Sequence, residues 1–234
     1  WTSADTFAGR MLVAHYGPAD LPETRLAWKL TDEAGRTLRS GHGAVTTLRR
    51  GKLNELDLLS FPLSDIRAPQ KLEMTLELPG SKFRNRYPIW VYPAAVDTTP
   101  PAGVHVCREW NAQTQVILAA GGKVLLLPGL ADLKDSIKGS FQCDFWCWPM
   151  FKRAAEREKI EVAPGTLGIL CDPAHPVFTH FPTESHSNWQ WWHLVKQARP
   201  MICDSTSADY RPLVQVIDNF ARNHKLGILF EARV

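Results

Sequence analysis

The residues that could do chemistry are concentrated in one stretch of the chain, residues 172–193. Its histidines, carboxylates, tryptophans and one asparagine are Asp172, His175, His180, Glu184, His186, Asn188, Trp189, Trp191, Trp192 and His193. Aromatic rings stack on the C–H faces of sugars, and a few placed polar groups in a concave site can bond sugar hydroxyls. The candidate residues for carbohydrate or interface contact are Glu184, His186, Asn188, Trp189, Trp191 and Trp192.

The same tryptophans also have a purely structural explanation. A helix predicted over residues 188–198 places Trp189, Trp192 and His193 at spacings that share one face. Tryptophans on such a helix commonly pack it onto a sheet or a neighbouring module, with the indole N–H bonded to a carbonyl. We expect this packing role ahead of sugar contact, and removal of Trp189 is then expected to destabilise the fold.

An enzyme or a metal centre in this stretch would need partners at defined spacings. A small independent hydrolase could be built from Asp172, Glu184 and His186. However, the histidines do not follow the His-Glu-x-x-His spacing of zinc enzymes, and no Gly-x-Ser-x-Gly turn presents a nucleophilic serine. We therefore predict no catalytic residue, no metal and no cofactor for this chain.

Composition excludes several functional classes. The chain has 234 residues and a formal net charge of +3. The charge is spread over both halves, so no nucleic-acid partner is expected. No apolar run approaches the length of a membrane span, and no signal peptide precedes the first strand. Because the sequence opens at Trp1 and not at Met, we expect it to be a portion of a longer polypeptide.

All of the cysteines fall in the second half of the chain. They are Cys107, Cys143, Cys147, Cys171 and Cys203. An odd number cannot pair completely within the chain, and most of these residues lie in or beside apolar runs. We expect buried free thiols in place of a disulfide framework.

The first part of the sequence has the pattern of an antiparallel β-sandwich. Leucines and a methionine at 72, 74, 76 and 78 alternate with polar residues, and a second alternating segment covers residues 26–31. Asp32 to Arg36, with Gly35 able to adopt positive φ, predicts a hairpin turn. Short strands with regular turns and no helical stretch predict an immunoglobulin-like β-sandwich over residues 1–95.

The pattern changes after a linker of prolines and threonines near residue 100. Apolar strand segments, such as 104–107 and 123–127, are interrupted by helix candidates at 111–120, 149–159 and 188–198. Continuous apolar runs indicate strands buried on both faces, as in a parallel sheet. Strands separated by helices predict a three-layer α/β domain of flavodoxin-like type over residues 103–234.

Several longer segments carry a resemblance to a known family. They are Asn-Arg-Tyr-Pro-Ile-Trp-Val-Tyr-Pro at 85–93, Asp-Pro-Ala-His-Pro at 172–176, the Trp-Gln-Trp-Trp run within 181–192, Val-Ile-Asp-Asn at 216–219, and the closing segment 225–233. Together they resemble the C-terminal region of bacterial family 2 glycoside hydrolases, the β-galactosidase, β-mannosidase and β-glucuronidase-like group. The resemblance covers nearly the whole chain.

This resemblance implies a parent enzyme that hydrolyses O-glycosidic bonds in β-glycosides. It implies an upstream catalytic barrel in the same polypeptide as the partner, and a periplasmic or extracellular location. It also implies that the second domain is class I amidotransferase-like. The cysteine elbow of amidotransferases is not matched, because Pro173 stands where the second glycine of Gly-x-Cys-x-Gly should be around Cys171.

The chain departs from the family's catalytic pattern because the barrel is missing. A barrel needs about 250 residues, and the single Asn-Glu pair, Asn54-Glu55, lies in the sandwich region. Retaining glycosidases need two carboxyl groups about 5 Å apart, and no pair of that kind is predicted. We therefore expect a non-catalytic accessory region. The alternatives are a carbohydrate-binding module at Trp189, Trp191 and Trp192, and a small hydrolase at Asp172, Glu184 and His186.

Overall fold

The structure is a computed structural model that describes residues 1–139, 148–159 and 165–233. The chain divides into two compact units. The first comprises residues 1–96 with 176–182, and the second comprises residues 97–175 with 183–234. The sequence predicts domains at 1–95 and 103–234, and these bounds remain a prediction.

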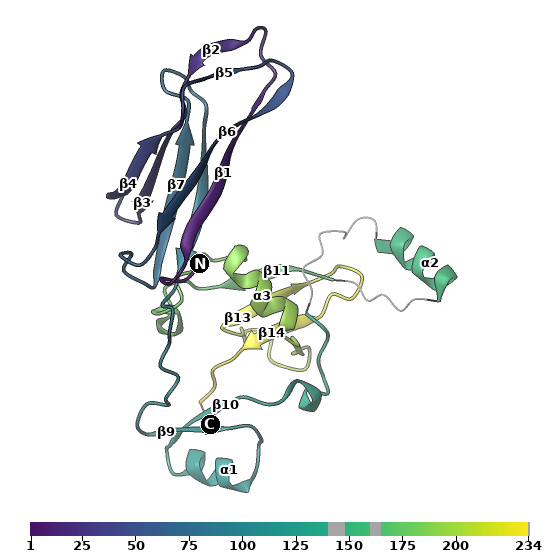
Figure 1. The fold of residues 1–234 in the computed structure, drawn as a ribbon. Coiled ribbons are helices and arrows are strands. Elements are labelled where there is room, and N and C mark those ends of the chain that lie inside the picture. The colour runs from purple at the N-terminus through teal and green to yellow at the C-terminus, as the bar shows by residue number, and fades with distance from the viewer. Residues whose placement is uncertain (140–147, 160–164, 234) are drawn as a thin grey trace. The chain divides into compact units, whose positions relative to one another are not determined.

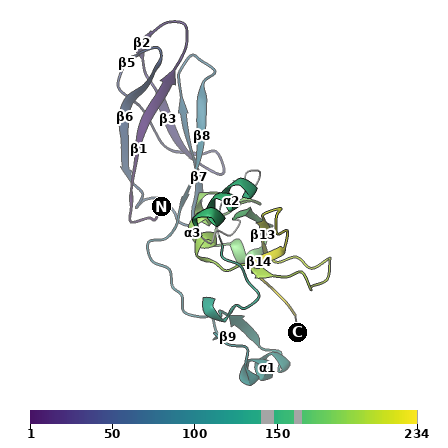
Figure 2. The ribbon, with the colours of Figure 1, turned by 90° about the vertical axis from the view of Figure 1, so that its right-hand side faces the viewer.

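The first unit is an antiparallel β structure (Figures 1 and 2). Its strands are β1 (Thr6–His15), β2 (Leu21–Thr24), β3 (Ala27–Asp32), β4 (Thr37–His42), β5 (Thr46–Leu48), β6 (Lys52–Pro62), β7 (Gln70–Glu77) and β8 (Arg84–Val91). One sheet has the order β4-β3-β7-β8, while β1 pairs with β6 and β2 with β5, all antiparallel. The prediction of a β-rich, antiparallel first part is confirmed.

Side chains from both large sheets meet in one core. Met11, Leu59 and Phe61 come from β1 and β6, and they cluster with Leu30 and Leu72 of the four-stranded sheet. The alternation in β7 explains this arrangement, because Leu72 and Met74 are buried while Glu73 and Glu77 are only partly covered. The Asp32 turn is also confirmed: Gly35 has φ of +78°, and its N–H donates to the Asp32 carbonyl over 2.9 Å.

A short segment distant in sequence completes the first unit. Residues 176–182 begin with the 3₁₀ turn η2 (Pro176–Phe178), and the Phe178 side chain is buried. The Phe181 ring stacks on Tyr92 with a centroid separation of 5.4 Å and an interplanar angle of 14°. Burial raises the pKa of the Tyr92 phenol above its ordinary range, so this hydroxyl stays protonated at any physiological pH.

The second unit contains the helices α1 to α3 and its own sheets. Its elements are β9 (Val104–Cys107), α1 (Ala112–Ala119), β10 (Lys123–Leu126), η1 (Leu130–Asp132), α2 (Trp148–Glu158), β11 (Thr166–Cys171), α3 (Trp189–Gln197), β12 (Met201–Ile202), β13 (Val214–Asp218) and β14 (Lys225–Leu229). The predicted helices are confirmed, and Gly121 after α1 has the expected positive φ of +78°. Strands β9 and β10 pair in parallel around α1.

The prediction of a flavodoxin-like parallel sheet is wrong for the described residues. Strands β11, β13, β14 and β12 form one sheet in that order, and each neighbouring pair is antiparallel. The reason lies in the connections. A parallel crossover needs a dozen or more residues, whereas only six separate Asp218 at the end of β13 from Lys225 at the start of β14. A link this short joins β13 and β14 as an antiparallel hairpin.

Asp218 organises that hairpin. Its carboxylate accepts the backbone N–H of Asn219 and of His224, over 2.8 and 2.9 Å. It also accepts the Arg222 guanidinium, which lies 2.7 Å from Oδ1. The side chain of Asp218 is 2% exposed and that of Arg222 is 18% exposed. The turn is therefore held by a buried, hydrogen-bonded ion pair that keeps β13 and β14 in register.

Candidate functional site

Helix α3 begins where the predicted site is densest. Asn188 is its N-cap, in extended conformation, and the Asn188 side-chain oxygen accepts the Trp189 N–H over 2.8 Å. From this start, Trp191 and Val195 fall one turn apart and form the buried stripe of the helix. Trp191 is 4% exposed and Val195 is fully covered. The packing role expected of a tryptophan on this helix therefore belongs to Trp191.

The other two tryptophans lie on the outer side of α3. Trp189 is 79% exposed and Trp192 is 43% exposed. The Lys196 ammonium lies over the Trp192 ring, 5.6 Å from its centroid. The Trp189 indole is mostly in solvent and is not the packing residue, so its loss is now expected to change stability little. The predicted common face of Trp189, Trp192 and His193 is the exposed face.

Thr183 anchors the buried tryptophan. The Trp191 indole N–H donates to the Thr183 hydroxyl oxygen over 2.7 Å, and the Gln190 amide approaches the same oxygen at 3.5 Å. The Thr183 hydroxyl in turn donates to the Glu184 carbonyl over 3.1 Å. A buried indole with a satisfied N–H is the arrangement expected for a packing residue. Trp191 is therefore not available as a ring on which a sugar could stack.

Glu184, His186 and Asn188 do come together, as the sequence suggested. The Asn188 side-chain NH₂ donates to Glu184 Oε2 over 2.9 Å, and His186 Nε2 lies 3.5 Å from the same oxygen. The Glu184 side chain is 26% exposed and the His186 side chain 62%. One carboxylate with an amide and an imidazole can bind a hydroxyl or brace the N-terminus of α3. It does not supply the two carboxyl groups of a glycosidase.

The remaining candidates of this stretch have local partners. Asp172 accepts the Ala174 N–H over 3.0 Å in a turn, and His175 Nε2 lies 3.4 Å from a Glu231 carboxylate oxygen. The His193 ring is hydrogen-bonded to Gln197 on α3. Within residues 1–139, 148–159 and 165–233, no group of three His, Cys, Asp or Glu side chains could hold a metal ion.

The cysteines have the character of inert thiols where they can be described. Cys107, Cys171 and Cys203 are free, while Cys143 and Cys147 lie outside the described residues. Cys171 donates to the Glu184 carbonyl, with 3.2 Å between sulfur and oxygen. Burial raises the pKa of the Cys171 thiol, with the Asp172 carboxylate adding to the rise and a hydrogen bond to Thr183 opposing it. A nucleophilic cysteine needs the opposite shift.

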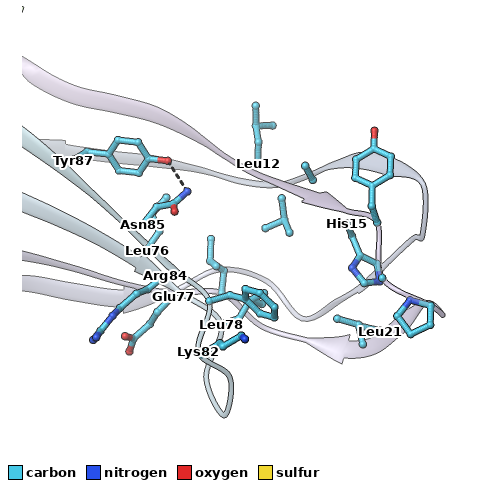
Figure 3. Close-up of a pocket in the computed structure, with 17 residues that line it drawn as sticks. Leu12, His15, Leu21, Leu76, Glu77, Leu78, Lys82, Arg84, Asn85 and Tyr87 are labelled. Atoms are coloured by element: carbon cyan, nitrogen blue, oxygen red, sulfur yellow. Dashed lines mark hydrogen bonds between the residues drawn. The ribbon is translucent and has the colours of Figure 1, made fainter.

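The sequence analysis missed a cavity in the first unit. An open groove of about 720 Å³ lies at one end of the sandwich, where β1, the loop after it, the end of β7 and the start of β8 converge (Figure 3). Val13 and His15 continue the inward-facing alternation of β1. Leu76 and Leu78 do the same along β7, above a buried Leu26. The groove is therefore an opening of the sandwich core toward solvent.

Polar and aromatic side chains line the two ends of this groove. On β8, Asn85 and Tyr87 occupy the alternate positions that become Ile89 and Val91 deeper in the core. The Asn85 NH₂ donates to the Tyr87 hydroxyl over 3.2 Å. Along this face of β8, aliphatic residues give way to polar and aromatic ones toward the start of the strand. That change in the sequence could have indicated an opening in the core.

No helix in the described ranges has the length and apolar character needed to cross a membrane. In comparisons with known proteins, no curated protein matched the chain. Residues 5–93 match a family model described as Domain of unknown function (DUF8488), and residues 105–234 match one described as Domain of unknown function (DUF8487). Neither description names a substrate or an activity. Because the second match covers more than half of the sequence, the chain belongs to the family described as Domain of unknown function (DUF8487).

Proposed function

We propose that this chain is a non-catalytic accessory region of a family 2-like glycoside hydrolase. Its role is to pack against and support the catalytic barrel of the same polypeptide, which hydrolyses β-glycosides. The first unit is the immunoglobulin-like module of that arrangement, a proposal supported by its antiparallel sheets around a shared core. The proposed parent enzyme and its barrel are supported by the sequence segments that resemble family 2 enzymes, such as 85–93 and 181–192.

The observation that carries the docking role is the outer face of α3. Two tryptophans three residues apart, Trp189 and Trp192, are exposed on one face of a short helix, at 79% and 43%. Large exposed apolar patches mark interaction surfaces, and tryptophan is the residue most enriched among the anchors of protein interfaces. Since Trp191 and Val195 already hold α3 to its own unit, the largely exposed ring of Trp189 can contact a neighbouring module.

The charged groups around this face are arranged for support and not for catalysis. The single carboxylate, Glu184, accepts from the amide of the helix cap. Acid–base hydrolysis needs a second carboxyl at a fixed distance on the other side of the scissile bond. The exposed Trp189 ring also keeps open the carbohydrate-binding alternative, without Trp191.

The docking role predicts a specific effect of α3 substitutions on association with the catalytic module. That module, expressed separately, is expected to bind this chain, and Trp189→Ala is expected to raise the dissociation constant by roughly 30-fold, the effect of an interface anchor worth about 2 kcal/mol. Isothermal titration calorimetry measures the constant. Val116→Ala on α1 is the matched control, because Val116 is also an exposed apolar helix residue, at 68%.

Absence of binding, or equal constants for Trp189→Ala and Val116→Ala, would contradict docking through α3. If Trp189→Ala leaves that constant unchanged but abolishes retention on an insoluble β-glucan, the exposed tryptophans contact sugar, and the chain is the carbohydrate-binding module of the alternative proposal.

A further inference from the structure

The groove in the first unit has the make-up of a ligand site. Its volume of about 720 Å³ falls within the range of small-molecule pockets. Two of its apolar residues are open to water: Leu21 is 42% exposed and Phe83 63%. A sandwich gains stability by closing such a face, so an opening of this size at the end of the core favours an occupant.

The polar groups that point into the groove are neutral hydrogen-bonding groups. At one end, the Tyr87 hydroxyl already accepts from Asn85, which leaves the Tyr87 proton to donate and the Asn85 carbonyl oxygen to accept. At the other end, His15 Nε2 donates to the Ala19 carbonyl over 2.7 Å, so Nδ1 of the neutral ring is an acceptor. A methyl group at Gly17 would lie 2.8 Å from His15 Cε1, so the glycine leaves room for this ring.

The fixed charges of the lining residues face elsewhere. Glu77 and Arg84 lie opposite each other on β7 and β8 and point together away from the groove (Figure 3). Both alternate with inward-facing residues, Leu76 and Asn85, so strand geometry places them on the outer face. Lys82, in the turn between these strands, is the remaining Lys, Arg or carboxylate among the lining residues. A cationic ligand would therefore find no carboxylate facing it, and an anionic ligand would find at most the Lys82 ammonium to compensate its loss of water.

An added peptide strand is a poor match for this opening. Strand β8 is an edge of its sheet, but it carries Pro88, which has no N–H to donate to an incoming strand. A compact ring satisfies the geometry better. Its flat apolar faces suit a groove lined by Val13, Leu76 and Leu78, and hydroxyls on its edges suit the Tyr87–Asn85 pair.

We propose that the groove binds a neutral ring compound with hydroxyl groups on its edges, held by the Asn85–Tyr87 pair. The ring is either a sugar or a phenol, since both offer apolar faces and edge hydroxyls. The site lies in the first unit and is independent of the docking role proposed for α3.

Calorimetric titration of the whole chain tests this site with three neutral probes: glucose, hydroquinone and phenyl β-D-glucopyranoside. Saturable binding of at least one probe is expected, and the probe that binds identifies the ring as sugar, phenol or both. Tyr87→Phe and Asn85→Ala should each weaken that binding about tenfold, the effect of one lost hydrogen bond. Arg86→Ala is the matched control, since Arg86 lies between them on the opposite face of β8 and pairs with Glu73 at 3.4 Å.

The variants keep the test independent of folding. Asn85 and Tyr87 are both exposed, Tyr87 at 47%, and Tyr87→Phe removes a single oxygen, so unchanged thermal unfolding is expected for both. Failure of all three probes to bind saturably would overturn the proposal. It would also be overturned by equal affinities in the Tyr87→Phe, Asn85→Ala and Arg86→Ala variants, or by tighter binding of the anion 4-hydroxybenzoate than of hydroquinone.

Discussion

Replacing Trp191 with alanine is expected to lower the free energy of unfolding of the second unit by about 3–5 kcal/mol, the range for a large buried aromatic residue. The side chain is 4% exposed and packs one helical turn from the fully buried Val195. Its removal leaves a cavity under α3 and takes away the indole N–H that the Thr183 hydroxyl now accepts over 2.7 Å. Both effects act in the same direction.

Trp189→Ala is the matched control for this prediction, because it makes the same change two residues away on the same helix. Trp189 is 79% exposed, so its loss should change stability by no more than about 0.5 kcal/mol. Urea unfolding is monitored by hydrogen exchange of the backbone amides in α3 and β11. These amides report the free energy of unfolding of the second unit separately. Equal losses in the two variants would mean that α3 is not packed through Trp191.

The second large effect is expected at the β13–β14 hairpin. Arg222→Ala should destabilise the second unit by about 3 kcal/mol or more, because a carboxylate that is 2% exposed would lose its cation while staying buried. Arg222→Lys should restore only part of the loss, since the guanidinium reaches Asp218 Oδ1 through both Nε and an NH₂ group, at 3.1 and 2.7 Å.

A surface ion pair of the same spacing provides the control for Arg222. Lys152 and Glu156 on α2 are also four residues apart, but their side chains are 57% and 61% exposed and lie 3.9 Å from each other. Lys152→Ala should cost no more than about 0.5 kcal/mol. The same urea unfolding experiment measures both variants. A loss at Arg222 as small as that at Lys152 would show that Asp218 is held by its backbone donors alone.

Local patterns in the sequence predicted the elements well, and the tertiary pairing poorly. The alternation of β7, the Gly35 turn and the helix near residues 188–198 each follow from a few neighbouring residues, and the structure has all three. The pairing of β11, β13 and β14 depends on which strands are joined by hairpins. The apolar runs predict a parallel sheet, but the six-residue link after Asp218 is long enough only for a hairpin.

The sequence did not distinguish the buried face of α3 from its exposed face. Trp189 and Trp192 form one helical stripe and Trp191 with Val195 another, so tryptophan alone does not tell which stripe is buried. The deciding feature is tertiary: Thr183, eight residues before Trp191, lies where it can accept the indole N–H. The sequence did not predict the groove in the first unit. The groove depends on the distance between β1 and β8, and the alternation of residues does not encode that distance.

The account depends on this chain having no glycosidase activity of its own. Its most direct test is the rate of release of nitrophenol from 4-nitrophenyl β-glycosides by the purified chain. The uncatalysed rate is predicted, because one carboxylate, Glu184, bound to its own helix cap, cannot serve as both acid and nucleophile. Turnover above that background, abolished by Glu184→Gln, would contradict the accessory role.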